Sequence, residues 1–349
     1  MRLFNFKNYN SFMRARLLFV FLWVGVVHAF AQTQGGNTVF SFLKNPATAE
    51  VAALGGSNVS LIGNNVAAGF SNPSLLRPAH HGQVATSFSS LLAGINQYSC
   101  MAGYTVGTQN IGLGVQYVNY GSIDQTDAAG NVLGMYRPSD FAVQLGTSKQ
   151  YKDKWWLGAA AKFIHSNYGQ YRSSALAVDA SLTYFDEAAG LQAGAVVTNM
   201  GTQLNAYAGA VKEELPFEIN AGISKKLADA PLQFSLTLQQ LQRFNLLGSD
   251  TSFIISESGK QFSTIEKMMS HVVLGAQLAV NENIHCNLGY NVLRRQSLNG
   301  YNITNGLNGV TFGVAVLMQK LHINYATGFY QRNMFHQLSL NFNFVNKAL

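Results

Sequence analysis

One pattern constrains this chain more than any other: polar and apolar residues alternate without interruption through its last segment. Between residues 337 and 344 the apolar residues are Leu338, Leu340, Phe342 and Phe344, separated from one another by amide and hydroxyl residues. Side chains of a β-strand point alternately to its two faces, so this stretch predicts a strand with one apolar and one amide-rich face. The pattern recurs along most of the chain. Such recurrence is typical of a barrel that turns its apolar face to lipid and its polar face to a lumen.

The first 31 residues have the features of an export signal. Arg14 and Arg16 precede an apolar run at 17–27, and residues 29–31 read Ala-Phe-Ala, which fits a small-residue cleavage site. The run is too short to cross a membrane as a helix. We therefore expect residues 1–31 to be removed and the mature chain to begin at Gln32.

The composition separates the chain from ordinary soluble domains. Charged residues make up 11% of it, against roughly 25% in soluble domains. Four of its basic residues lie in the signal, and no basic stripe of the kind that binds nucleic acid follows. Beyond the signal no apolar stretch approaches the ~20 residues of a spanning helix. A charge-poor, exported chain of this kind suits an all-β outer-membrane barrel.

Fourteen segments have the alternation and the length of barrel strands, most of them close to the ~9–11 residues that a tilted strand needs to cross hydrocarbon. Their expected ranges are 84–93, 97–106, 111–120, 139–149, 154–167, 171–186, 190–199, 216–227, 230–243, 271–281, 284–294, 307–319, 321–331 and 334–346. We therefore expect an antiparallel transmembrane β-barrel of about 14 strands, occupying residues 84–349.

The connections between these strands sort by length. The four long ones are 121–138, 200–215, 244–270 and 295–306, and all fall on the same side of the expected barrel. Outer-membrane barrels have short periplasmic turns and longer outside loops. The sorting predicts periplasmic termini and extracellular long loops.

Residues 32–83 do not have the strand pattern. Asn45, Pro46 and Gly55 mark a short helix, with Asn45 as N-cap, Pro46 at the first helical position and Gly55 just past the end. A ring of about fourteen strands is wider than the ~8-stranded barrels that side chains alone can fill. We expect residues 32–83 to form a plug, or hatch, inside the lumen.

Three charged residues lie at the alternating strand positions that are expected to face the lumen. They are Lys162, Asp179 and Glu218, which we expect to pair inside the lumen or to contact the plug. The histidines are scattered and lack metal-ligand spacing, and no nucleophile elbow or phosphate-binding loop is present. The two cysteines, Cys100 and Cys286, have lipid-facing parity on distant strands and are expected to be unpaired. The sequence therefore predicts no enzyme, no cofactor and no metal site.

The long connection at 244–270 carries the strongest signal for a partner surface. Ser263 and Glu266 have the spacing of a capping box at the start of a short helix. Apolar residues in this connection are the candidates for partner contact: Phe253, Ile254, Ile255, Ile265, Met268 and Met269. A loop folded over the barrel mouth explains the same residues equally well.

Several stretches also resemble known proteins. Residues 52–56, Ala-Ala-Leu-Gly-Gly, and 70–76, Phe-Ser-Asn-Pro-Ser-Leu-Leu, resemble the start of FadL-like outer-membrane proteins. Residues 119–121, 198–204 and 215–227 resemble the PorQ family of the Bacteroidetes type IX secretion system. The likeness covers nearly all of the mature chain.

The resemblance implies a fourteen-stranded barrel with an N-terminal hatch. It further implies a non-catalytic, monomeric barrel within the cell-surface attachment complex, together with PorU, PorV and PorZ. In that complex cargo proteins are processed and joined to lipopolysaccharide, and this subunit would chiefly anchor PorZ in outer-membrane lipid.

Two other functions remain open. A FadL-like transporter of hydrophobic compounds would need an apolar inner pocket and a lateral gap in the wall. The inner face, rich in Gly, Gln, Ser and Asn, argues weakly against it. An outer-membrane enzyme would need a clustered catalytic set, which the sequence does not show.

Overall fold

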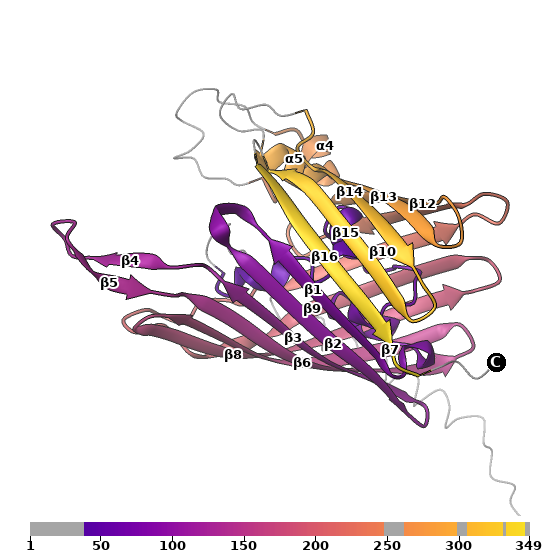
Figure 1. The fold of residues 1–349 in the computed structure, drawn as a ribbon, viewed down its shortest axis with the longest axis horizontal. Coiled ribbons are helices and arrows are strands. Elements are labelled where there is room, and N and C mark those ends of the chain that lie inside the picture. Colours follow the sequence, from indigo (N-terminus) through magenta and orange to yellow (C-terminus); the bar gives the residue numbers. More distant parts are fainter. Residues whose placement is uncertain (1–37, 248–261, 299–305, 331–332, 346–349) are drawn as a thin grey trace, which may run out of the picture. The chain divides into compact units, whose positions relative to one another are not determined.

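The chain forms a closed antiparallel barrel, as the alternation predicts. The computed structural model describes residues 38–247, 262–298, 306–330 and 333–345, and in them fourteen strands close into a ring (Figure 1). The barrel strands are β1 (Gln83–Ser90), β2 (Asn96–Val106), β3 (Gln109–Asn119), β6 (Ser139–Lys152), β7 (Trp155–Tyr168), β8 (Tyr171–Asp186), β9 (Leu191–Asn205), β10 (Glu218–Lys226), β11 (Leu232–Leu238), β12 (Val272–Ala279), β13 (Ile284–Asn291), β14 (Val310–Leu317), β15 (Leu321–Tyr330) and β16 (Asn333–Asn343). The ring closes where β1 pairs with β16, Gln83 lying opposite Asn343.

The two faces of the wall differ as expected. On β16, Gln337, Ser339 and Asn341 are buried on the inner face, whereas Leu338 is exposed on the outer face. Cys100 on β2 and Cys286 on β13 are exposed and unpaired. The exposed apolar side chains therefore lie on the outer face, whereas the buried amides and hydroxyls of the wall lie on the inner face, together with some apolar side chains that pack on the plug. Within the described ranges no helix is both long and apolar enough to span a membrane.

The short turns 107–108, 153–154, 187–190, 227–231, 280–283 and 318–320 all lie at one end of the barrel, which we call the short-turn end. The opposite end, where the long connections lie, is the long-loop end. At that end the strands differ most from the expected ranges. β11 stops at Leu238 because Gln240 adopts a left-handed backbone conformation, with φ of 54°. β13 stops at Asn291 because the Asn291 side chain accepts the backbone N–H of Arg294 and helix α5 (Val292–Leu298) begins.

Two further features at the long-loop end were not expected. β9 extends to Asn205, beyond a bulge at which its register with β8 shifts between Val178 and Ala180. The connection after β3 forms a hairpin of its own from β4 (Ile123–Thr126) and β5 (Val132–Tyr136), visible as the projecting ribbon in Figure 1. All four β4 residues are exposed.

The segment from residue 38 to residue 82 packs inside the barrel, and we call it the plug. It contains α2 (Ala49–Ala53) and four 3₁₀ helices, η1 (Ser41–Lys44), η2 (Val66–Phe70), η3 (Pro73–Leu75) and η4 (Pro78–His80). One more 3₁₀ turn, η5 (Leu92–Gly94), joins β1 to β2. The apolar core lies between plug and wall: Val66, Phe70 and Leu76 of the plug pack with Met101 of β2.

The plug helix lies close to its expected place but has a different N-cap. Thr48 caps α2, its hydroxyl accepting the backbone N–H of Val51, whereas Asn45 ends the preceding helix η1. The expectation of Asn45 as N-cap and Pro46 as first helical residue was therefore wrong. Gly55 does lie just past the helix end, with φ of 94°, a left-handed conformation that glycine adopts without strain.

Glycines of the wall let the plug approach the strands closely. A Cβ placed on Gly158 of β7 would lie 2.1 Å from the backbone nitrogen of Ser74, and one on Gly289 of β13 would lie 2.0 Å from that of Gly55. No larger residue fits at either position while the plug stays in place. Part of the glycine content of this chain therefore serves plug docking.

Candidate functional site: the plugged lumen and its two ends

Inner-face side chains bond directly to the backbone of the plug. Gln144 donates to the Gly69 carbonyl at 3.0 Å and Gln192 donates to the Leu61 carbonyl at 2.7 Å. Further bonds from wall side chains to plug carbonyls come from β2, β6, β13, β14 and β16: Ser99 to Ala47, Ser148 to Leu76, Asn291 to Gly55, Thr311 to Ala53 and Asn341 to Asn64. The polar inner face thus satisfies backbone groups of a non-helical segment that would otherwise be buried without partners.

The three lumen charges singled out from the sequence lie in two separate ion pairs. Lys162 Nζ lies 2.7 Å from Asp179 Oδ2, and both side chains are buried. Glu218 lies 3.7 Å from Lys44 of the plug. One pair therefore joins two wall strands, and the other joins wall and plug.

The Lys162–Asp179 pair organises the bulge in β9. Asn199 has a φ of 58°; its backbone N–H donates to Asp179 Oδ1 at 2.8 Å, and its side-chain oxygen accepts from Lys162 at 2.9 Å. The Asn199 amide nitrogen also donates to the Pro216 carbonyl. Lys162 and Asp179 thus bond to each other and to Asn199, all three of them residues of the wall.

At the long-loop end a buried carboxylate collects hydroxyl groups. Asp140 accepts from Tyr120 at 2.6 Å and from Tyr168 at 3.1 Å, and it also bonds Ser166. The pKa of Tyr120 is raised by burial and by its bond to Asp140. The cluster fixes the chain at the base of the β4–β5 hairpin, because Tyr120 directly follows β3.

The partner candidates of the 244–270 connection are partly described. Helix α4 (Thr264–Met269) carries the expected capping box, with reciprocal bonds between Ser263 and Glu266. Ile265, Met268 and Met269 are exposed, Ile265 to 72%. Phe253, Ile254 and Ile255 lie outside the described residues.

Charged plug residues stand out in the structure and were missed from the sequence. Between residues 38 and 82 the only acidic or basic residues apart from histidine are Lys44, Glu50 and Arg77. Their rarity in a charge-poor segment was the signal that could have identified them. Lys44 has its ion pair with Glu218, but Glu50 and Arg77 form no ion pair within the described part of the chain.

Arg77 lies at the short-turn end beside a cavity of about 630 Å³. Its guanidinium carbon lies 4.1 Å from the ring centroid of Trp156 and 5.4 Å from that of Phe185. It donates to the Ser74 carbonyl at 2.5 Å, and burial lowers its pKa to about 9. Burial and the nearby Arg77 also lower the pKa of His80 to about 3.

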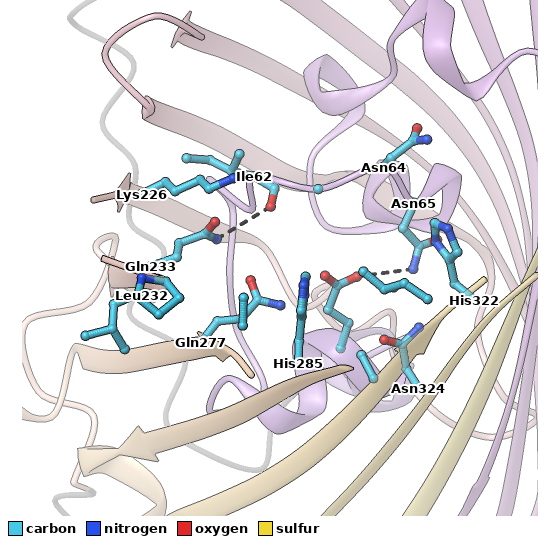
Figure 2. Close-up of a pocket in the computed structure, with 16 residues that line it drawn as sticks. Ile62, Asn64, Asn65, Lys226, Leu232, Gln233, Gln277, His285, His322 and Asn324 are labelled. Atoms are coloured by element: carbon cyan, nitrogen blue, oxygen red, sulfur yellow. Dashed lines mark hydrogen bonds between the residues drawn. The ribbon is translucent and has the colours of Figure 1, made fainter. Parts of the chain in front are cut away.

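A second cavity, of about 410 Å³, lies at the short-turn end between the plug and strands β10 to β15. Figure 2 shows that His285, His322, Gln277 and Asn324 of the wall line it together with plug residues. The plug residues 62–65 contribute to both cavities and stand between them. Among the described residues no group of three His, Cys, Asp or Glu side chains is arranged to hold a metal ion.

Comparison with known proteins shows the fold. No protein-family model matches the sequence, and no curated protein matches it either. The structure is similar to the Pseudomonas putida toluene transporter TodX, with a TM-score of 0.53 and 14% identity over 86% of this chain and 99% of that one. It is also similar to a Pseudomonas aeruginosa FadL homologue, with a TM-score of 0.47 and 10% identity over 86% of this chain and 98% of that one. The likeness to TodX extends over nearly the whole length of both chains and concerns the fold alone.

Proposed function

We propose that this chain is a non-catalytic outer-membrane anchor whose long-loop end holds a surface partner. The observation that carries the proposal is the plugged lumen: wall side chains bond to plug carbonyls from strands around the ring. A lumen occupied in this way leaves the exposed elements at the long-loop end as the surface offered to other molecules. The termini would be periplasmic and the long loops extracellular, as in other outer-membrane barrels.

The partner follows from the sequence resemblance. A member of the PorQ family would anchor PorZ and work with PorU and PorV in the type IX secretion attachment complex. The exposed apolar side chains of α4 support a docking role, because apolar groups gathered on a surface loop mark interaction sites. We assign this docking role to the exposed residues Ile265, Met268 and Met269 of α4.

The test is capture of PorZ from detergent-solubilised outer membranes. Replacing Ile265 and Met268 by Glu should remove PorZ from the material that co-purifies with the barrel. The matched control is Val280→Glu, which changes a 58% exposed apolar residue at the short-turn end and should leave capture unchanged. PorZ retained by the double variant would place the contact elsewhere, and no PorZ with the unaltered protein would refute the anchor.

A channel for hydrophobic compounds is the second candidate, and the likeness to solved structures bears on this candidate alone. TodX is described as a toluene transporter, and the two cavities offer space inside the lumen. Against it, every barrel strand pairs with both of its neighbours. Toluene uptake by cells that make the protein decides between the candidates: faster uptake than in cells without it favours the channel, and equal uptake favours the anchor.

A further inference from the structure

We propose that the 410 Å³ cavity at the short-turn end is a binding site for a small amine with an apolar body, whose ammonium group pairs with the carboxylate of Glu50. The proposal does not rest on the anchoring function. It concerns the opposite end of the barrel from α4, and it holds whichever of the two candidate functions is correct.

The position of Glu50 follows from the plug helix. Glu50 is the second residue of α2, and its neighbours Ala49 and Val51 are buried against the wall and the rest of the plug. The Glu50 side chain instead lines the cavity, which places a partly exposed carboxylate inside the barrel. α2 is held by the bond from the Ala49 N–H to Ser339 of β16, at 2.7 Å.

Among the described residues this carboxylate has no cationic partner in an ion pair. The hydrogen bond that its side chain forms within these residues comes from the Asn65 amide, at 3.3 Å, and is drawn as a dashed line in Figure 2. Burial raises the pKa of the Glu50 carboxyl, and the hydrogen bond from Asn65 offsets this effect only in part. A desolvated carboxylate of this kind is stabilised by a cation that brings its own N–H donors, since charge-assisted hydrogen bonds are roughly twice as strong as neutral ones.

The rest of the cavity defines what surrounds the ammonium group. The apolar wall is made by Ile62, Pro231, Leu232, Ala279, Ala315 and Leu317. The imidazoles of His285 and His322 and the amides of Gln277 and Asn324 add hydrogen-bonding groups on the same surface (Figure 2). One anionic group with a mostly apolar lining fits an organic amine better than a sugar or a free metal ion.

Lys226 is the one other fully charged group in the lining. It is exposed at the end of β10, where solvent and salt screen its charge more than they screen a buried one. It should weaken amine binding slightly without preventing it. Lys226→Met is therefore expected to strengthen amine binding. This effect is opposite in sign to that expected of Glu50→Gln, so the two variants test the proposal in different directions.

The experiment uses benzylamine as the probe, with benzyl alcohol and benzoate as analogues of the same shape but different charge. Binding is measured by NMR titration of the full-length mature protein in lipid nanodiscs at pH 7.5. Benzylamine should bind more tightly than either analogue. Glu50→Gln should weaken benzylamine binding by about tenfold or more, as expected for loss of a charged hydrogen-bond partner, and should leave benzyl alcohol unchanged.

Two variants keep the result interpretable. Glu213→Gln removes an exposed carboxylate from the long-loop end and should not alter benzylamine binding. Ala279→Phe fills the cavity from the wall without touching the carboxylate and should abolish binding, which covers the case in which the Glu50 variant does not fold. Equal binding by the unaltered protein and the Glu50 variant, tighter binding of benzoate, or no benzylamine binding overturns the proposal. None of these results affects PorZ capture, so failure here is distinct from failure of the anchor.

Discussion

Single residues contribute unequally to the stability of the wall, as two lysine–aspartate pairs of β7, β8 and the turn before β7 illustrate. Lys162 and Asp179 are buried, whereas Lys154 of the Lys154–Asp186 pair has a side chain exposed to 49%. Removing one member of a buried pair leaves a charge without a partner, at a cost of roughly 3–5 kcal/mol. An exposed pair contributes much less, because solvent and salt screen its two charges.

We therefore expect Lys162→Met to destabilise the folded barrel by several times more than Lys154→Met. The measurement is the urea midpoint for folding into phosphatidylcholine vesicles, followed by tryptophan fluorescence. Adding Asp179→Asn to the Lys162 variant should recover part of the loss, because the unpaired charge is then gone. Similar midpoints for the two lysine variants would show that the buried pair is not a major source of stability.

His80 gives the plug a dependence on pH. Its Nδ1 accepts the backbone N–H of Arg77 at 3.1 Å, which requires the unprotonated ring nitrogen. Because the folded pKa of about 3 lies below the ordinary value of 6.5, the unfolded chain takes up the proton first as the pH falls. The contribution of His80 is therefore complete above pH 6.5 and is lost progressively from there toward pH 3.

The expected consequence is a loss of about 2 kcal/mol between pH 7.5 and pH 5 that His80→Asn does not show. The urea midpoints of the two proteins at both pH values check it. Only the difference between them is informative, because other groups titrate in both. An identical pH dependence in the variant would mean that the pKa of His80 is the same in the folded and the unfolded protein.

At the scale of elements, the contact between the plug and β7 depends on the absence of a side chain at Gly158. Gly158→Ala would push a methyl group into the backbone of Ser74, so the plug should loosen there while the strand still forms. We expect ion conductance in planar bilayers to rise above that of the unaltered protein. The control is Gly134→Ala on β5, where nothing lies within 4 Å. If the conductance of the Gly158 variant were no higher than that of the control, the plug would have accommodated the added methyl group.

For the whole molecule, the sorting of turns and loops predicts its orientation. In a background with Cys100→Ser and Cys286→Ser, Ala129→Cys places a thiol in the turn of the β4–β5 hairpin, and Thr108→Cys places one in a short turn. A membrane-impermeant maleimide should label the first in intact cells and the second only after lysis. The reverse labelling pattern would mean that the barrel has the opposite orientation in the membrane.

The regular part of this fold was predictable because each wall strand faces two different environments. Exposed apolar side chains on the outer face and amide or hydroxyl side chains against the plug produce the alternation, so all fourteen strands could be located from the sequence. Strand ends at the long-loop end were not predictable, because they depend on Gln240, Asn291 and the bulge at Asn199, whose conformations are set by tertiary contacts.

The site residues show the same division. The inward direction of Lys162, Asp179 and Glu218 followed from parity, but their partners depend on strand register and plug position, which a single strand does not encode. Glu50 and Arg77 were missed because their setting is formed by segments far apart in the sequence. The plug helix was placed a few residues early because Asn45 and Thr48 are both good caps, and only packing chooses between them.

The junction between plug and first strand also limits how such a molecule can be assembled. Gln83, the first residue of β1, accepts the Val66 N–H and the Asn341 amide through one side-chain oxygen. The same glutamine therefore binds the plug and, across the seam, the last strand of the ring. Because the plug and both seam strands meet at this one side chain, we expect the plug to be in place when the first and last strands pair, so that folding of the N-terminal segment and closure of the ring are coupled.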